Sequence, residues 1–266
     1  MFDFHMHSDF SADCTVPMEN MIEGAIRKGV KGICFTEHID YDYPDETIIF
    51  DFDLQQYNQK LTQLREKYNG LIEIQKGVEI GVQPHILKRC DQLMAEEAFD
   101  FVICSMHTTD RKSLHYKEIF EGRTVEEAFE LYYTEFLHCI KNFKQFNVLG
   151  HVDLIKRYTD QPSNDLFHDA LGEIFKEIIP DGKGIELNTS GVRYGLSHAL
   201  PSDDVLALYK RCGGEIITLG SDAHRESEIA FQFKESLERL QAIGFKYVAT
   251  FDKQQPVFHK IEKLFT

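Results

Sequence analysis

Short apolar runs alternate along the chain with longer segments in which apolar residues recur every three or four positions. The short runs predict buried β-strands, and the longer segments predict helices that bury one face. The predicted strands are Phe2–His5, Gly32–Thr36, Ile72–Val78, Phe101–Ser105, Val148–Gly150, Gly184–Asn188, Glu215–Leu219 and Lys246–Thr250. The predicted helices are Pro17–Lys28, Leu54–Tyr68, Pro84–Glu96, Val125–Phe143, Ser163–Ile178, Ser202–Arg211 and Glu228–Ala242.

This alternation of strands and helices is typical of a parallel sheet with helical crossovers. Seven or eight such units in a chain of 266 residues fit a single α/β barrel with one core. We therefore predict an α/β fold in which residues 1–266 form one domain. Two segments, Tyr41–Asp51 and Thr108–Arg123, are predicted to be long loops at the same end of the barrel, where substrate specificity commonly resides.

The composition of the chain bears on its cellular compartment and on the state of its cysteines. No segment approaches the roughly 20 consecutive apolar residues of a membrane span, and the segment from Met1 to Asp9 lacks a signal-peptide pattern. The six cysteines stand singly, without a CxxC pair, which argues against a disulfide framework and a thiolate zinc site. We expect a cytoplasmic protein with reduced, mostly buried cysteines.

The net charge and the absence of nucleotide-binding motifs limit which ligands and partners we expect. A formal net charge of −15 repels phosphate backbones and anionic lipid surfaces, so we expect no nucleic-acid or membrane partner. Neither GxxxxGK(S/T) nor GxGxxG occurs, so no nucleotide cofactor is indicated. The twelve histidines matter more, because neutral imidazole is the commonest protein ligand for transition metals.

Metal-capable side chains follow most of the predicted strands. They are His5 and His7, Glu37 and His38, Glu79, His107, His151 and Asp153, Asn188, and Asp222 and His224. Because the carboxyl ends of parallel barrel strands meet at one face, these side chains are predicted to converge there. Imidazole and carboxylate ligands together suit zinc, iron and manganese, so the pattern predicts a multinuclear metal site. Asp153 could instead orient His151 as a hydrogen-bond acceptor.

The order of several short segments carries a resemblance to a known family. They are FDFHMHSDFSAD, FTEHID, GVEIGV, ICSMHTTD, LGHVDLI and LGSDAH. With these segments the chain resembles the polymerase and histidinol phosphatase (PHP) family over nearly its whole length, and it is most similar to the histidinol-phosphate phosphatases. The resemblance implies a distorted (β/α)7 barrel. It also implies two to three divalent metal ions, for which zinc, iron and manganese stay open.

The resemblance further implies which residues hold the metals. The first ion would be bound by His5, His7, Glu79 and Asp222, the second by Glu79 as a bridge with His107 and His151, and the third by Asp13, His38 and His224. Asp13 stands where some members of the family have histidine. This change keeps a ligand but could alter the metal preferred at the third position.

A mechanism follows from these ligands. Divalent cations lower the pKa of bound water to about 7, which supplies a hydroxide for in-line attack on phosphorus. Glu79 and His107 would support this catalysis through the metals they bind. Arg157 and Arg193 would clamp the phosphoryl oxygens, because a guanidinium matches phosphate geometry bidentately. A plain surface role for either arginine is an equal alternative.

The predicted function is metal-dependent hydrolysis of a small phosphomonoester, with L-histidinol phosphate in histidine biosynthesis as the first candidate. The alternatives are a phosphatase for another monoester, including phosphotyrosine, a nuclease, which the charge of −15 disfavours, and a non-catalytic metal-binding module. An intact ligand set favours an enzyme.

The oligomeric state stays open. So does the proton donor to the leaving group, which could be metal-bound water or a side chain such as Asp40 or His115. The acidic residues Asp40, Asp42, Asp45 and Glu46 could meet a substrate amine or imidazole, or form a solvated charge run.

Overall fold

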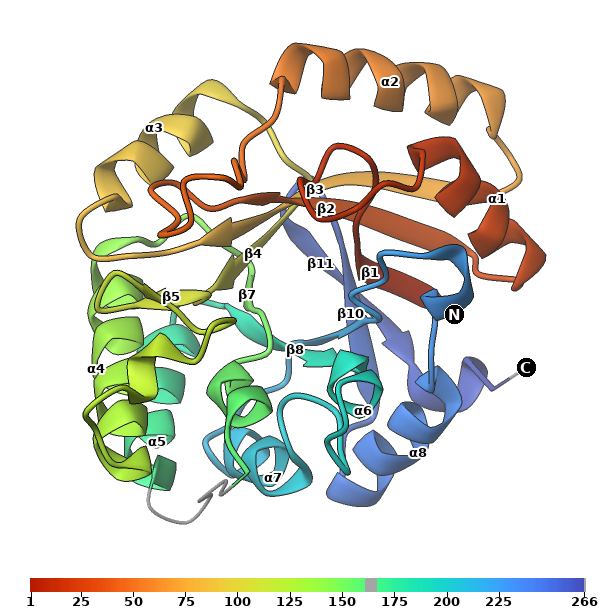
Figure 1. Ribbon diagram of the computed structural model, residues 1–266. Helices are drawn as coiled ribbons and strands as arrows, with labels where there is room; N and C mark the ends of the chain where they lie inside the picture. Colours follow the sequence, from red (N-terminus) through yellow and green to blue (C-terminus); the bar gives the residue numbers. More distant parts are fainter. Residues whose placement is uncertain (161–166, 266) are drawn as a thin grey trace.

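Seven parallel strands form a sheet that winds into a barrel in the computed structural model, which describes residues 1–160 and 167–265 (Figure 1). In sheet order these strands are β1 (Phe2–Met6), β2 (Gly32–Ile39), β3 (Glu73–Gly81), β4 (Phe101–Ser105), β7 (Val148–Leu149), β8 (Gly184–Asn188) and β9 (Ile217–Gly220). Every neighbouring pair is parallel. All carboxyl ends therefore meet at one face, as the predicted site requires.

The barrel closes between β1 and the segment that follows β9. The Asp222 N–H donates to the His5 carbonyl at 2.8 Å, and the His7 N–H donates to the Ala223 carbonyl at 2.9 Å. Met6 and Ala223 form an isolated parallel bridge at this seam instead of a regular ladder. The predicted distorted (β/α)7 barrel is therefore confirmed, and its distortion lies at the seam between two segments that carry predicted ligands.

Helices cover the outside of the barrel, except for the short helix that follows β8 at the carboxyl ends of the strands (Figure 1). The helices are α1 (Met18–Arg27), α2 (Leu54–Lys67), α3 (Leu87–Glu96), α4 (Val125–Asn142), α5 (His168–Ile178), α6 (Ser190–Arg193), α7 (Asp203–Arg211) and α8 (Phe233–Ile243). In α1 the buried residues Met18, Met21 and Ala25 recur at helical spacing and join the large core between helices and sheet. Burial of a side chain such as Met21 contributes roughly 1.5–3 kcal/mol. In the described part of the chain, no helix is long and apolar enough to cross a membrane.

The interior of the barrel is built in two layers. Near the amino ends of the strands it is apolar and contains Phe4, Cys34, Phe101, Ile103 and Val148. Nearer the carboxyl ends the fully buried residues become polar: His5, Glu79, Ser105, Glu186 and Asn188. Side chains alternate across a strand, so intervening residues such as Val78 and Leu187 belong instead to the core beneath the helices.

A hairpin closes the amino end of the barrel. It consists of β10 (Tyr247–Asp252) and β11 (Gln255–Lys260), which pair with each other outside the barrel sheet. Phe251 joins the apolar interior cluster, and its ring centroid lies 5.0 Å from that of Phe101. The predicted strand Lys246–Thr250 is therefore present, but it belongs to this closing hairpin and not to the barrel wall.

Most other predicted elements differ from the structure by a few residues at their ends. Pro84–Glu96 begins as a helix only at Leu87, because a turn precedes it. Glu228–Ala242 begins at Phe233. The first residues of Ser163–Ile178 lie outside the described residues. The elements of the described residues that the sequence did not predict include α6, the six-residue strand β11, and the two-residue strands β5 (Thr108–Thr109) and β6 (Lys112–Ser113).

Candidate metal centre

Two histidines come from the end of β1. The register of β1 against β2 shifts between Asp3 and Met6, which marks an irregularity such as an extra residue in β1. Phe4 joins the apolar interior cluster, and the next residue, His5, also faces the interior. His5 and His7 are fully buried, with their Nε2 atoms 3.1 Å apart. The two rings of the HxH motif therefore meet at one point inside the barrel.

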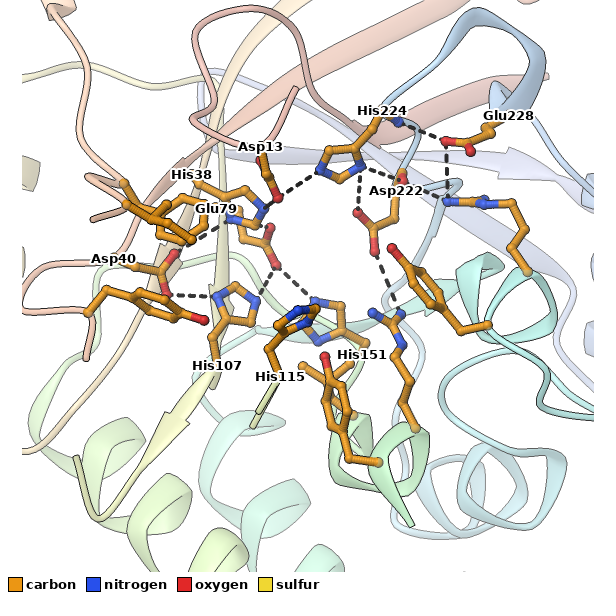
Figure 2. Close-up of a pocket in the computed structure, with 18 of the residues that line it drawn as sticks. Asp13, His38, Asp40, Glu79, His107, His115, His151, Asp222, His224 and Glu228 are labelled. Atoms are coloured by element: carbon orange, nitrogen blue, oxygen red, sulfur yellow. Dashed lines mark hydrogen bonds and ion pairs between the residues drawn. The ribbon is translucent and has the colours of Figure 1, made fainter. Parts of the chain in front are cut away.

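Glu79, fully buried on β3, lies at the centre of the site. Its Oε2 is 3.1 Å from Nε2 of His5 and 3.6 Å from Nε2 of His7. Its Oε1 is 2.9 Å from Nε2 of His151 and 3.3 Å from Nε2 of His107 (Figure 2). Oε2 also lies 3.1 Å from Nδ1 of His38. The two oxygens of one carboxylate thus face two separate groups of histidines, which is the placement that a bridging ligand needs.

A third group of side chains lies beside His7. The rings of His38 and His224 both stack against the His7 ring, with centroids 4.2 Å and 4.3 Å from it and 6.1 Å from each other. Asp13 Oδ2 is 3.6 Å from His38 Nε2 and 3.3 Å from His224 Nε2. Asp222 Oδ1 reaches His7 Nε2 at 3.4 Å. Residues from β1, β2 and the segment after β9 therefore meet in one cluster.

Electrostatics keep Glu79, Asp222 and His7 in the protonation states that metal ligands need, whereas His38 differs: burial opposes its charge, but Asp13 raises its pKa to about 9. Burial opposes ionisation of Glu79, but neighbouring histidines, His5 first, hold the pKa of its carboxyl well below the usual range. The pKa of Asp222 is also held well below its usual range by His5, against the effect of burial. Burial, and then the charge of His38, lower the pKa of His7 to about 3. At neutral pH both carboxylates are therefore ionised and His7 is neutral.

The donor set fits divalent cations. Nδ1 of His5 bonds to Glu186 at 2.6 Å and Nδ1 of His7 bonds to Ser11 at 3.1 Å, so both Nε2 atoms point toward each other. The two facing Nε2 atoms can share at most one proton in a hydrogen bond. A cation between them, in contrast, would accept a lone pair from each nitrogen. Overlapping sets of ligand atoms within 4.8 Å of one another are His7, His38 and His224; His5, His7 and Asp222; and His38, Glu79 and His107.

A cavity of about 700 Å³ opens at this centre, a volume typical of small-molecule sites. Arg157 and Arg193 both line it, with side chains only 10% and 15% exposed. Arg157 donates to Ser190 Oγ at 2.5 Å and stacks on Tyr194, 4.0 Å from the ring centroid. Arg193 donates to two backbone carbonyls of the segment after β9, both at 2.7 Å. Both arginines are therefore largely buried beside the cavity, and their role as a phosphate clamp stays a prediction.

The loop after β2 lines the cavity with Tyr43 and Phe50, but most of its acidic side chains do not. Asp42 faces Arg89 at 3.8 Å, and Asp45 accepts a hydrogen bond from Tyr116 at 2.6 Å. Only Asp40 of these acidic residues lines the cavity, and its carboxylate bonds to a histidine of the centre. The solvated-charge interpretation of this loop is therefore the better one for Asp42 and Asp45.

A comparison with known proteins identifies the family. The model of the PHP domain matches residues 3–190. The chain belongs to the PHP family. It is 30% identical to the histidinol-phosphatase of Lactococcus lactis over 254 residues, which cover 94% of this chain and 93% of that protein. It is 29% identical to a probable histidinol-phosphatase of Clostridium acetobutylicum over 255 residues, with 93% and 96% covered.

A solved structure is similar over the same extent. The crystal structure of the Lactococcus lactis histidinol phosphate phosphatase, complexed with zinc, L-histidinol and phosphate, superposes with a TM-score of 0.84 at 30% identity. The match covers 96% of this chain and 98% of that one. At this identity and coverage, the likeness extends over the whole barrel, including the face that carries the histidines.

The structure brings together every residue predicted as a ligand in this PHP chain. They are His5, His7, Asp13, His38, Glu79, His107, His151, Asp222 and His224. Asp13 differs from the rest, because its side chain is 41% exposed. It therefore stands at the rim of the centre.

The expectation that Asp153 orients His151 is wrong. Asp153 Oδ2 accepts from Lys156 Nζ at 2.7 Å and from the Ser202 N–H at 3.2 Å. Among the described residues, Nδ1 of His151 has no hydrogen-bond partner. Asp153 instead forms a buried ion pair with Lys156 and ties it to the start of α7.

Buried partners of other ligand histidines were missed. Glu186 accepts from His5, and the Ser11 hydroxyl that contacts His7 donates to Glu37 at 2.6 Å. Glu37 had been grouped with the metal-capable residues, but it faces serines. One signal could have revealed Glu186: an acidic residue at an interior position of an otherwise apolar strand is costly to bury without a partner.

Proposed function

We propose that this protein is a metal-dependent phosphomonoesterase that hydrolyses L-histidinol phosphate. The proposal rests chiefly on one arrangement, in which the Glu79 carboxylate lies between two pairs of histidines while Arg157 and Arg193 line the same cavity. The substrate is suggested by the similar Lactococcus lactis enzyme, whose crystal structure holds zinc, L-histidinol and phosphate. A cavity of about 700 Å³ suits a metabolite of this size.

The metal ligands in this proposal follow the contacts around Glu79. One cation is assigned to His5, His7, Glu79 and Asp222, a second to Glu79, His107 and His151, and a third to Asp13, His38 and His224. Zinc, iron and manganese all suit imidazole and carboxylate together. When bound, such cations supply positive charge beside the phosphoryl group and lower the pKa of water to about 7.

The protein's own side chains bind and orient the substrate. Arg157 and Arg193 are assigned to the phosphoryl oxygens, where they offset the charge that develops during transfer. Two backbone carbonyls hold the Arg193 guanidinium, so it is oriented before the substrate arrives. Arg157 has an Nε without a hydrogen-bond partner among the described residues, which leaves donors free for the substrate.

The two side chains considered as proton donors differ in how well they suit that role. Asp40 accepts from Nδ1 of His107 at 2.7 Å. Burial opposes its ionisation, but His107 holds the pKa of Asp40 below its usual value. Asp40 is therefore ionised at neutral pH and is better suited to orienting His107 than to protonating the leaving oxygen. His115 is exposed and lines the cavity, so we assign the proton to His115 or to water.

Phosphate release from L-histidinol phosphate, measured beside other monoesters on protein whose metals have been counted, tests this function. We expect kcat/KM for histidinol phosphate to exceed that for phosphotyrosine and for sugar phosphates by at least about tenfold, the preference that about 1.4 kcal/mol gives. We also expect two to three metal ions per chain. Equal or faster hydrolysis of phosphotyrosyl peptides would keep the chemistry and replace the substrate.

Replacing Arg157 by alanine should lower kcat/KM about 10²–10³-fold, because one preorganised charge contact to the transition state is worth roughly 3–4 kcal/mol. Arg157→Lys should recover only part of this loss, since an ammonium cannot bond bidentately. Steady-state kinetics measure both. Arg239→Ala is the matched control, because Arg239 lies on α8 with 43% of its side chain exposed. Wild-type kcat/KM in Arg157→Ala would remove Arg157 from the phosphate site.

A further inference from the structure

We infer that Glu186 is a positioning residue that fixes the ring of His5 and thereby sets the metal affinity of the site that His5 serves. Glu186 lies on β8 and His5 on β1, so the contact joins strands that are distant in sequence. Both side chains are fully buried. The inference rests on the proposed metal-dependent function, and its test is chosen so that the two can fail separately.

The contact determines which nitrogen of His5 carries the proton. Oε1 of Glu186 lies 2.6 Å from Nδ1 of His5. An ionised carboxylate can only accept, so Nδ1 must donate its hydrogen. In the neutral ring Nε2 is then left with a free lone pair, directed toward Glu79 and His7, both 3.1 Å away. Glu186 therefore presents the nitrogen that a cation requires.

The second oxygen of Glu186 ties this ring to the neighbouring strands. Oε2 accepts from the backbone N–H of His151 at 3.1 Å and from the side-chain amide of Asn188 at 3.2 Å. One carboxylate thus fixes His5 relative to the backbone that carries His151. The distance between two of the proposed metal sites depends on this connection.

The backbone beside Glu186 is shaped to admit the carboxylate. A Cβ on Gly220, at the end of β9, would lie 2.0 Å from Oε1 of Glu186 and 2.5 Å from Cβ of His5. No side chain can be placed there without displacing one of these groups. Glycine at the LGSD position is therefore explained by the contact between Glu186 and His5.

The charge of Glu186 also points to a cation nearby. Among the described residues, neither lysine nor arginine forms an ion pair with Glu186, and the titratable side chain that it contacts is the His5 ring, which must be neutral to bind a cation. A buried carboxylate without a positive partner is costly. A divalent ion on the opposite nitrogen of His5 would offset this cost through the ring, as in other carboxylate–histidine–metal arrangements.

Other ligand histidines have comparable partners, which supports the same role. Asp40 accepts from Nδ1 of His107 at 2.7 Å. Glu186 differs from Asp40 because it contacts no solvent cavity: it is fully buried, whereas Asp40 lines the substrate pocket. Changing Glu186 should therefore act on the metal site without removing a substrate contact.

Zinc binding to Glu186→Gln tests the inference. Competition with a chromophoric chelator should show one zinc ion per chain bound roughly 10–100-fold more weakly than in the wild type, the usual cost of losing such a partner. Long-range ¹⁵N NMR of the zinc-loaded protein should show His5 protonated on Nδ1 in the wild type and a changed pattern in the variant. A purely structural role would leave this tautomer signature unchanged.

Two further variants keep the test decisive. Asp153→Asn removes an equally buried carboxylate that contacts Lys156 and none of the assigned ligands, so it should lower stability and leave zinc affinity unchanged. Glu186→Asp keeps the charge but draws it back by about 1.5 Å, so it should also weaken one zinc ion. It replaces the glutamine variant if that variant does not fold.

The outcomes separate the inference from the proposed function. Wild-type zinc affinity and an unchanged His5 signature in a folded Glu186 variant would overturn the positioning role. Wild-type protein that bound no zinc, iron or manganese would overturn the metal-dependent function itself. Equal weakening of every zinc site, seen in Asp153→Asn as well as in the Glu186 variants, would also overturn the positioning role, because a general loss of stability would then explain the effect.

Discussion

Replacing Glu79 by glutamine is expected to reduce phosphate release by about 10³-fold or more while leaving the barrel folded. The Glu79 carboxylate faces His5 and His7 with one oxygen and His107 and His151 with the other. An amide offers a single neutral acceptor, so it cannot serve both pairs as an anion. Each cation supplies several kcal/mol of transition-state stabilisation, and 1.36 kcal/mol corresponds to a factor of ten in rate.

Glu73→Gln is the matched control for this substitution. Glu73 lies on the same strand, but at its exposed amino end, away from the cavity. Elemental analysis should show fewer metal ions in Glu79→Gln and an unchanged number in Glu73→Gln. Circular dichroism should show the same secondary structure in both. Wild-type turnover in Glu79→Gln would rule out Glu79 as a bridge between metals.

The barrel could be predicted from the sequence because each strand carries its own local signal. Phe101–Ser105 and Gly184–Asn188 were predicted with the bounds that the structure has. Parallel strands also place all carboxyl ends together, so residues such as Glu79 and His107 could be grouped without knowledge of their distances. The convergence of the candidate ligands follows from the fold class and the position of each residue on its strand.

The positions of partners could not be predicted in the same way. Glu186 meets His5 only because β8 and β1 are brought close by closure of the barrel at a seam without a regular ladder. Sequence spacing contains no information about that seam. Asp153 shows the opposite error: it lies two residues from His151, but its carboxylate turns to Lys156. Closeness in sequence was a poor guide to side-chain direction outside the strands.

The hairpin at the amino end of the barrel shows a further limit of prediction from the sequence. The strand Lys246–Thr250 has the apolar pattern of a barrel strand because Ala249 and Phe251 do enter the barrel interior. They enter through the amino end of the barrel and do not belong to a strand of the barrel sheet. A pattern of apolar residues indicates that one side of a strand is buried, but it does not indicate which part of the protein covers that side.

Removing the metals is expected to abolish phosphate release and to lower the melting temperature of the protein by about 10 °C. Ligands that bind only the folded state stabilise it by RT ln(1 + [L]/Kd), about 4 kcal/mol at a thousandfold excess over Kd. For a chain of this size, 1 kcal/mol corresponds to roughly 2–4 °C. Without cations, Glu79 and Glu186 are left as buried carboxylates whose ion-pair partners among the described residues are histidines, and Asp222 keeps histidines and Arg157, 3.9 Å away.

Calorimetry before and after dialysis against a strong chelator measures this shift, and Glu79→Gln provides its internal comparison. Because that variant should already have lost metal, its melting temperature should respond less to the chelator than that of the wild type. Adding back zinc, iron or manganese should restore both activity and stability, and the ion that restores activity most fully is the best candidate for the native metal. Full activity in protein shown by elemental analysis to be metal-free would contradict the whole assignment, because the arginines alone could not supply the nucleophile that the ligand cluster is arranged to produce.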